Sequence, residues 1–237
     1  EKYGYSYDYA EQQLYNAGLE IHCAMDLDLQ RDMESLFLHN TDMLPADPAV
    51  QLGFFMMDPY TGRIMAVVGS REERSGALIQ NNATMSTRQS GSSIKPLSPY
   101  ALGLENGTIT WGSVLKDQPI PELSGDSRGW PQNFSMQYTK YMCVDKAIEV
   151  SQNAPAAWLA YDMTAAACYD WLVNKLHFST LDPERDRNSV ACSIGGQTYG
   201  VTVRDMTAAF CIFANGGVYH EPMSYYYVKD HDGNVIL

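Results

Sequence analysis

The strongest indication of the fold is one short string, Arg88-Gln89-Ser90-Gly91-Ser92-Ser93-Ile94-Lys95-Pro96. A helix would place Ser92 and Lys95 on one face, one turn apart, so that the amine can reach the hydroxyl. Gly91 allows a tight turn before the helix, and Pro96 fits the first helical turn, where its missing N–H leaves no hydrogen bond unmade. Ser92 would then lie at a helix N-terminus, where the positive end of the helix dipole stabilises a developing oxyanion.

Pro99 lies beyond the first turn of the same helix and is expected to kink or loosen it. The pattern Ser-x-x-Lys is weakly specific when taken alone, because ordinary residue usage produces about one in a chain of this length. A second copy does occur at Ser113–Lys116, where Gly112 precedes the serine but no proline follows the lysine. A solvated helix start is therefore the alternative interpretation of Ser92 and Lys95.

A second string, Ser151-Gln152-Asn153, follows a stretch with helical periodicity, and Pro155 can begin another helix just beyond it. Ser151 and Asn153 are therefore expected in the loop between two helices. Helix capping is the other common role of serine and asparagine in such a position. The presence of both strings in one chain favours a catalytic role for each.

The rest of the chain predicts a mixture of helices and short strands. Leu52–Met57 and Ile64–Val68 are expected to form a hairpin, and their nearly continuous apolar character predicts burial on both faces. Thr202–Asp205 has the pattern of a capping box, and the helix after it would present one apolar face made of Met206, Ala209, Phe210 and Phe213. The other predicted elements are helices at 8–15 and 28–38 and strands at 19–24, 225–228 and 235–237.

Length and composition fit one sizeable soluble domain with a small appendage. The chain has 237 residues, of which 45% are hydrophobic and 19% charged. A net charge of −12 argues against a nucleic-acid partner and against an anionic lipid surface. The apolar stretches are far shorter than the roughly 18 residues of a membrane span. The five cysteines are scattered, so we expect buried small apolar side chains and neither a zinc site nor a disulfide framework.

Residues 88–96 resemble the Arg-Gln-Pro-Gly-Ser-x-x-Lys-Pro block of the class A, or bifunctional, penicillin-binding proteins. The likeness continues, in the family's order, through residues 18–30, 58–66, 200–206 and 213–218. It implies an α+β fold, the penicillin-binding protein/serine β-lactamase-like transpeptidase fold, with helices packed on an antiparallel sheet. Residues 1–50 would then be a linker or lead-in segment, and residues 51–237 the N-terminal and central part of the transpeptidase domain.

The resemblance assigns a role to each candidate site residue. Ser92 would attack the carbonyl between the last two D-alanines of a peptidoglycan stem peptide while Lys95 takes its proton. Ser151 would relay a proton to the leaving D-alanine, and Asn153 would bind the peptide group of the substrate. An amine of a neighbouring stem peptide would resolve the acyl-enzyme, and β-lactam antibiotics would trap Ser92 as an ester. The reaction needs no metal or cofactor. The parent protein would lie at the extracytoplasmic face of the bacterial cell membrane, with a membrane anchor and an upstream glycosyltransferase domain.

The family's third motif, Lys-Thr/Ser-Gly, does not occur in the sequence. In the family its lysine helps to lower the pKa of the catalytic lysine, which must fall by about 3.4 units to be half neutral at pH 7. Its strand also supplies an oxyanion-hole N–H, and the loss of one such donor costs about 10²–10³ in rate. The resemblance therefore implies that the polypeptide continues past Leu237 with further strands, and that these residues alone are inactive.

Two alternative functions remain open from the sequence. A serine β-lactamase shares the fold, but no Glu-x-x-Leu-Asn string follows Ser151 to activate a deacylating water. A non-catalytic scaffold module would keep the fold without the chemistry, which the absent third motif permits. Lys-Thr/Ser-Gly beyond Leu237 would favour the transpeptidase over the scaffold.

Overall fold

The chain forms an α+β fold in which helices pack around short antiparallel strand pairs. The computed structural model describes residues 4–39, 44–45, 47, 49–72, 76, 79–125 and 129–237. The α-helices of this part are α1 Tyr7–Asn16, α2 Leu27–His39, α3 Ala101–Glu105, α4 Val144–Glu149, α5 Asn153–Met163, α6 Ala165–Asn174, α7 Val190–Ser193 and α8 Val203–Phe210. The strands are β1 Glu20–Cys23, β2 Phe54–Met57, β3 Ile64–Val68, β4 Val114–Asp117, β5 Lys140–Cys143 and β6 Tyr225–Lys229.

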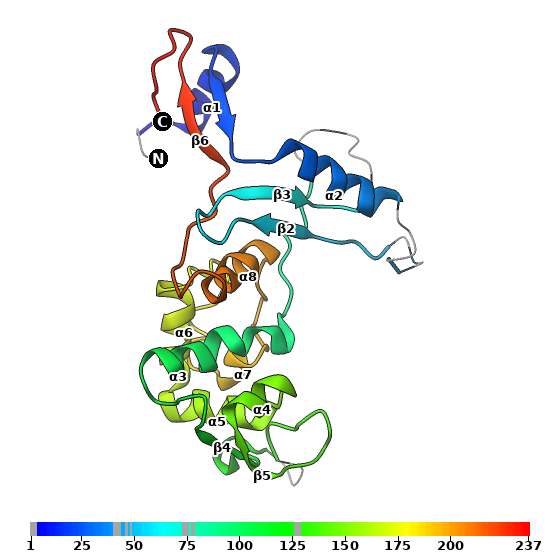
Figure 1. Cartoon of the computed structure of the whole chain (residues 1–237), viewed down its shortest axis with the longest axis vertical. Coiled ribbons are helices and arrows are strands. Elements are labelled where there is room, and N and C mark those ends of the chain that lie inside the picture. The colour runs from blue at the N-terminus through cyan, green and yellow to red at the C-terminus, as the bar shows by residue number, and fades with distance from the viewer. Residues whose placement is uncertain are drawn as a thin grey trace.

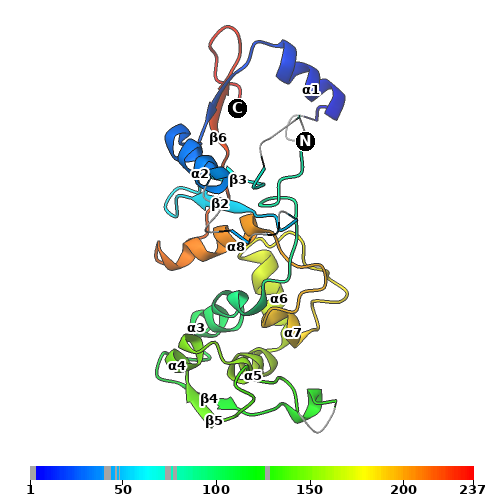
Figure 2. The same ribbon diagram turned by 90° about the vertical axis from the view of Figure 1, so that its right-hand side faces the viewer.

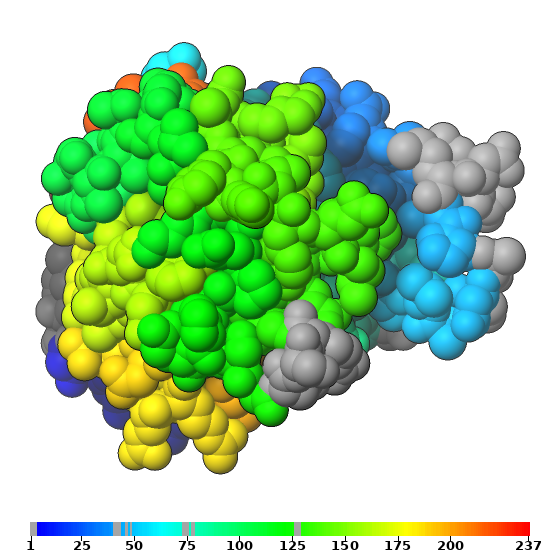
Figure 3. All heavy atoms as spheres, turned by 90° about the horizontal axis from the view of Figure 1, so that it is seen from below, coloured from blue at the N-terminus to red at the C-terminus, as the bar shows by residue number. Residues whose placement is uncertain are grey.

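The elements follow one another along a single long axis. Helix α1 and strands β1 and β6 lie at one end, α2 and the β2–β3 hairpin lie in the middle, and α3 to α7 with β4 and β5 form the other end (Figure 1). The turned view shows the same order (Figure 2). Seen from below, the surface of this helical end is formed largely by the green to yellow segments, which run from α3 to α7 (Figure 3). Both strings singled out in the sequence belong to the helical end.

The described strands form three antiparallel pairs, β1 with β6, β2 with β3, and β4 with β5. In the first pair Glu20 lies opposite Lys229, which joins two segments far apart in the sequence. The second pair is the predicted hairpin, with Phe55 opposite Val67. After β6 the chain turns back, and Val235 forms a bridge with Lys229. The α+β class and the antiparallel pairing are therefore confirmed.

The β2–β3 hairpin lies between α2 on one face and α8 on the other (Figure 1). On the α8 side, Phe55 and Met57 are buried in one cluster with Ala208. On the α2 side, the side-chain oxygen of Gln30 accepts from the N–H of Val67 at 2.8 Å, and its amide donates to the Val67 carbonyl at 2.9 Å. Both faces of the hairpin are thus covered, as its apolar sequence predicts, with alternate residues only half-buried.

The core of the helical end is built from the first string and from α5. Helix α5 is apolar around most of its circumference, so the fold places it at the centre, and residues 154–160 are all buried. Ile94 and Leu97 are 0% exposed and pack with Leu172 of α6. Tyr100 packs with Leu159 of α5. These contacts fix the segment that carries Lys95 against the helix that begins at Asn153.

The sequence prediction for α8 is correct at its start and wrong on part of its face. Thr202 caps the helix, because its hydroxyl accepts from the N–H of Asp205 at 3.0 Å. The Asp205 carboxylate does not complete a capping box, since it accepts from the N–H and hydroxyl of Ser179 at 3.0 and 2.7 Å. Phe210 and Phe213 are 39% and 53% exposed, so they do not belong to the core. The buried face carries small residues, and after Phe210 the helix tightens into a 3₁₀ turn that rotates Phe213 outward.

The five cysteines are free thiols, and the expectation of burial is met by Cys168, Cys192 and Cys211. Cys23 and Cys143 are exposed, because they end strand pairs whose residues are mostly exposed. No helix within the described residues is long and apolar enough to span a bilayer.

Candidate active site

The first string forms a helical segment of unusual and changing pitch. Residues Gly91–Ile94 make a 3₁₀ turn, in which the N–H of Lys95 donates to the carbonyl of Ser92 at 3.2 Å. Pro96–Tyr100 then form a π-helical turn, which leads into α3. Pro99 offers no N–H to the ladder, and the N–H of Tyr100 reaches five residues back to the carbonyl of Lys95 at 3.3 Å. The predicted loosening at Pro99 is therefore confirmed.

Ser92 and Lys95 differ sharply in exposure. Ser92 is exposed, and its hydroxyl makes no hydrogen bond to any residue that the structure describes. Lys95 is 2% exposed, so its side chain runs through the protein interior. Ser92 therefore faces solvent, whereas the side chain of Lys95, one turn later, is buried in the protein.

The Lys95 amine contacts both predicted residues of the second string. It donates to the backbone carbonyl of Ser151 at 2.8 Å, to the Ser151 hydroxyl at 3.4 Å and to Asn153 Oδ1 at 2.5 Å. All three acceptors are neutral, so the ammonium loses hydration without gaining a counter-ion. Burial therefore lowers the pKa of Lys95 from 10.5 to about 8.

The second string forms the turn between α4 and α5. Ser151 has a φ of 53°, a left-handed conformation that strains a residue with a Cβ. Its N–H and that of Gln152 donate to carbonyls in the last turn of α4 at 3.1 and 3.0 Å, so the first helix ends in a C-cap. Asn153 is already the first residue of α5, whereas the sequence placed it in the loop. The sharp turn directs Ser151 and Asn153 toward the same amine.

A buried polar network holds this turn in place, and the sequence gives no sign of it. Asn133 Oδ1 accepts from the N–H groups of Asn153 and Ala154, both at 3.0 Å, and so caps α5 from a distant loop. Asn133 Nδ2 donates to the carboxylate of Asp117 at 2.7 Å. The side-chain amide of Gln152 donates to the same carboxylate at 3.3 Å. Asp117 at the end of β4 therefore holds the second string in two ways, directly through Gln152 and indirectly through Asn133, which caps α5.

Neighbouring groups decide the ionisation of Asp117. Burial raises the pKa of its carboxyl group, and hydrogen bonds from Thr139, Asn133 and Gln152 lower it. The hydrogen bonds prevail, so the pKa of Asp117 lies below its usual value of 3.8. The network thus surrounds a buried carboxylate.

The second Ser-x-x-Lys copy has no such surroundings. Lys116 lies in strand β4, and its ammonium is 3.9 Å from the centre of the Trp158 ring. Ser113 lies in a turn, where its hydroxyl accepts from the N–H of Thr110 at 2.9 Å. The Ser113 hydroxyl and the Lys116 amine thus have separate partners, so this copy does not form a serine–lysine pair. The described histidines, cysteines and carboxylates form no group that could hold a metal ion.

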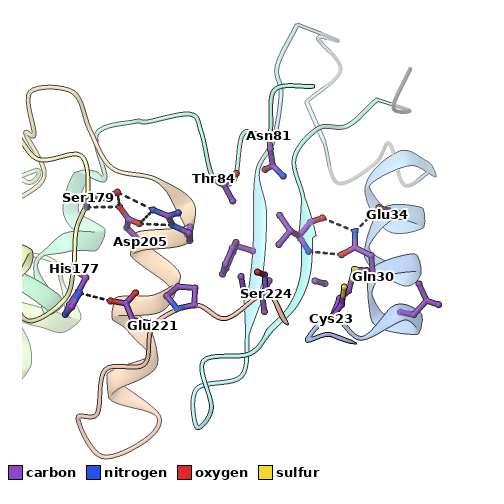
Figure 4. A pocket seen from close by; sticks show the side chains of 18 of the residues that line it. Cys23, Gln30, Glu34, Asn81, Thr84, His177, Ser179, Asp205, Glu221 and Ser224 are labelled. Carbon is purple, nitrogen blue, oxygen red and sulfur yellow. Dashed lines mark hydrogen bonds and ion pairs between the residues drawn. The ribbon is translucent and has the colours of Figure 1, made fainter. Parts of the chain in front are cut away.

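A cavity of about 960 Å³ lies away from these residues, around the β2–β3 hairpin (Figure 4). None of the four predicted site residues lines it. Four of the charged side chains that line it form pairs: His177 contacts Glu221 at 2.6 Å, and Arg204 contacts Asp205 at 3.1 Å. The cavity is therefore separate from the site around Lys95.

A model of the family described as the penicillin binding protein transpeptidase domain matches residues 52–234. Penicillin-binding protein 1A of Clostridium perfringens is 27% identical over 259 residues, which cover 100% of this chain and 37% of that protein. Penicillin-binding protein 1A of Clostridium novyi is 30% identical over 99% of this chain and 28% of that protein. The chain thus spans about a third of the length of these curated relatives.

Solved structures share the fold. The penicillin-binding protein PonA1 of Mycobacterium tuberculosis matches 96% of this chain and 58% of its own chain, with a TM-score of 0.77 at 22% identity. The same protein has been solved in complex with penicillin V, with a TM-score of 0.76 to this chain at 21% identity. Penicillin-binding protein 1A of Haemophilus influenzae matches 82% of this chain and 28% of its own chain, with a TM-score of 0.65 at 28% identity.

Proposed function

Because the chain belongs to the family of penicillin-binding protein transpeptidase domains, we propose that Ser92 is the nucleophile of a peptidoglycan transpeptidase that β-lactams also acylate. One observation carries the proposal. The buried amine of Lys95 contacts Ser151 Oγ at 3.4 Å and Asn153 Oδ1 at 2.5 Å, across 56 and 58 positions of sequence. Lys95, Ser151 and Asn153 thus lie in contact although they come from two separate strings, and Ser92 lies three positions before Lys95 in the same helical segment.

Lys95 acts as the general base for Ser92. With a pKa of about 8, about a tenth of the amine is neutral at pH 7, roughly 300-fold more than for a lysine at 10.5. The neutral amine takes the serine proton as Ser92 Oγ bonds to the carbonyl carbon of the substrate. The C–N bond to the terminal D-alanine then breaks, and the acyl group remains on Ser92 as an ester.

Ser151 and Asn153 complete the cycle. The Ser151 hydroxyl, next to the protonated amine, passes a proton to the nitrogen of the leaving D-alanine. Asn153 has two amide hydrogens, one of which donates to the carbonyl of Gln132 at 2.7 Å. The other is left for a carbonyl of the bound peptide. An amine of a second stem peptide then attacks the ester, forms the cross-link and releases Ser92.

The whole protein is proposed to work on peptidoglycan at the extracytoplasmic face of the cell membrane, with an anchor and a glycosyltransferase domain elsewhere in the polypeptide. Water in place of the acceptor amine would give D-Ala-D-Ala carboxypeptidase activity. The 237 residues contain no Lys-Thr/Ser-Gly string. By themselves they are therefore proposed to be inactive, because the lysine and the oxyanion donor of that motif are missing from them.

The test is intact-protein mass spectrometry of the full-length protein with a reactive penicillin, followed by peptide mapping. We expect one adduct, at Ser92, that is lost in Ser92→Ala and kept in Ser113→Ala. Ser113 is a matched control because it begins the other Ser-x-x-Lys copy. A folded protein that takes up no penicillin, or an adduct on another residue, would contradict the proposal and favour a scaffold module.

A further inference from the structure

Gln197 is a fully buried polar side chain that the proposed chemistry does not use. It lies in the loop between α7 and α8 and is 0% exposed. Its side-chain oxygen accepts from the backbone N–H of Ser90 at 3.1 Å, and its amide lies 2.8 Å from the Ser90 hydroxyl. The same amide donates to the carbonyl of Cys192 at 3.1 Å. Gln197 therefore links the α7–α8 loop to the residue two positions before Ser92.

The backbone of this loop fits the first string equally closely. Arg88 and Val201 exchange two backbone hydrogen bonds, of 3.1 and 2.8 Å. Gly195 has a φ of +116°, and a Cβ on it would collide with the backbone of Gly91. Residues 195–201 thus lie directly against residues 88–91. Small displacements of this loop must be transmitted to the 3₁₀ turn that presents Ser92.

We propose that Gln197 is a positioning residue for Ser92 and acts by satisfying the partly buried N–H of Ser90. A backbone donor that loses its partner inside a protein must find another one, so the Ser90 peptide group would rotate or admit water. Either change moves the turn that begins at Gly91. The inference rests on the proposed function, because it assigns to Gln197 an effect on the acylation of Ser92.

The backbone of Ser90 offers a specific way to test this role. Its φ is −68°, a value that proline adopts without strain. Proline has no N–H, so a proline at position 90 needs no acceptor from Gln197. Ser90→Pro should therefore repair the defect of a variant in which Gln197 is replaced by an apolar side chain of similar size. It should not repair damage that arises elsewhere in the core.

The experiment compares Gln197→Met, Ser90→Pro and the double variant in the full-length protein. The measured quantities are the second-order rate constant for acylation by a fluorescent penicillin, the Tm and the hydrogen exchange of amides 91–94. Gln30→Met is the matched control, because Gln30 is also buried and also bonds to a backbone N–H, on the far side of the β2–β3 hairpin. We expect Gln197→Met to slow acylation about 10- to 100-fold and to speed exchange at 91–94. The double variant should regain most of the acylation rate and most of the protection of amides 91–94 from exchange. Gln30→Met should lower the Tm without changing either quantity.

Two results would overturn the inference. One is acylation and exchange in Gln197→Met that match the unsubstituted protein, and the other is a double variant no better than Gln197→Met. If the unsubstituted protein is not acylated at all, the proposed function fails, but exchange at 91–94 and the Tm of the double variant still decide whether Gln197 holds this turn through Ser90.

Discussion

The carboxylate of Asp117 accepts a hydrogen bond of 2.7 Å from Asn133, and the two residues are 0% and 1% exposed. Asn133 in turn caps α5 at Asn153, so a charge at the end of β4 determines where a residue in contact with Lys95 lies. The lowered pKa of this carboxyl group comes from hydrogen bonds that Thr139, Asn133 and Gln152 donate. A buried network of this kind is stable only while every member is satisfied.

Asp117→Asn should therefore destabilise the protein and slow acylation. The new amide hydrogens would face the donors of Asn133 and Thr139, and the free energy of unfolding at pH 7 should fall by about 2–3 kcal/mol. Urea unfolding measures this change, and the exposed Asp28 provides the control Asp28→Asn, which should be close to neutral. Equal losses in the two variants would contradict the anchoring role of Asp117.

The same variant should also change the response to acid. The folded pKa of Asp117 is lower than the unfolded one, so its contribution to stability is complete above about pH 4. That contribution is lost as the pH falls through the folded pKa. The difference in unfolding free energy between the unsubstituted protein and Asp117→Asn should thus shrink below pH 4. A difference that stays constant from pH 7 down to pH 2 would show that folding does not shift the pKa of Asp117, and would contradict the lowered pKa.

Lys95 should make stability rise at alkaline pH. Its folded pKa of about 8 is lower than the unfolded value of 10.5, so the unfolded chain binds more protons between these two values. Stability should increase across pH 8 to 10.5 by on the order of 2 kcal/mol, after allowance for solvent screening. Lys95→Met should lack this increase when both proteins are unfolded by urea over the same range. Parallel pH profiles for the two proteins would contradict the shifted pKa.

Two substitutions of Ser151 should differ in stability but lose activity to the same extent. Its φ of 53° costs about 1 kcal/mol in a residue with a Cβ, a strain that glycine does not have. Ser151→Gly should therefore be about 1 kcal/mol more stable than Ser151→Ala, although both remove the hydroxyl. Both should lose about 10²-fold or more in the rate of acyl transfer. If the two variants unfold at the same urea concentration, the turn is not strained.

Two adjacent glycines should differ in their tolerance of a methyl group. Gly195→Ala would force a Cβ into the backbone of Gly91 at a positive φ, so we expect a lower Tm and slower acylation of Ser92. Gly196→Ala is the matched control, because the nearest atom to its Cβ would be the carbonyl oxygen of Ala191 at 3.3 Å. Thermal unfolding and penicillin acylation of both variants test the contact. Equal tolerance would mean that the α7–α8 loop does not brace the first string.

The sequence identifies those site residues whose neighbours lie close along the chain. Ser92 and Lys95 are three positions apart, and Gly91 and Pro96 mark the turn around them. The contact between Lys95 and Ser151 is not local, and only the resemblance to a known family suggested it. The family and the fold are confirmed by the comparisons, whereas the division at residue 50 and the catalytic roles stay predictions.

The residues that support the site could not be predicted in this way. Asp117, Asn133 and Gln197 stand in ordinary polar surroundings in the sequence, and their importance comes from burial by segments 16 to 107 positions away. The prediction that Phe210 and Phe213 are buried was wrong for a different reason. Helical periodicity assumes that large apolar residues face the core. At α8 the hairpin lies against Ala208, which leaves both rings outside.

The pairing of β1 with β6 bears on the order in which the molecule folds. Glu20 meets Lys229 only after the intervening polypeptide has been brought together, and closing so long a loop costs about 5 kcal/mol of chain entropy. The lysine site needs closures of only 56 to 58 positions, within the helical end. The site should thus assemble early and survive transient separation of the two strands, whose amides should exchange with solvent well before those of α5.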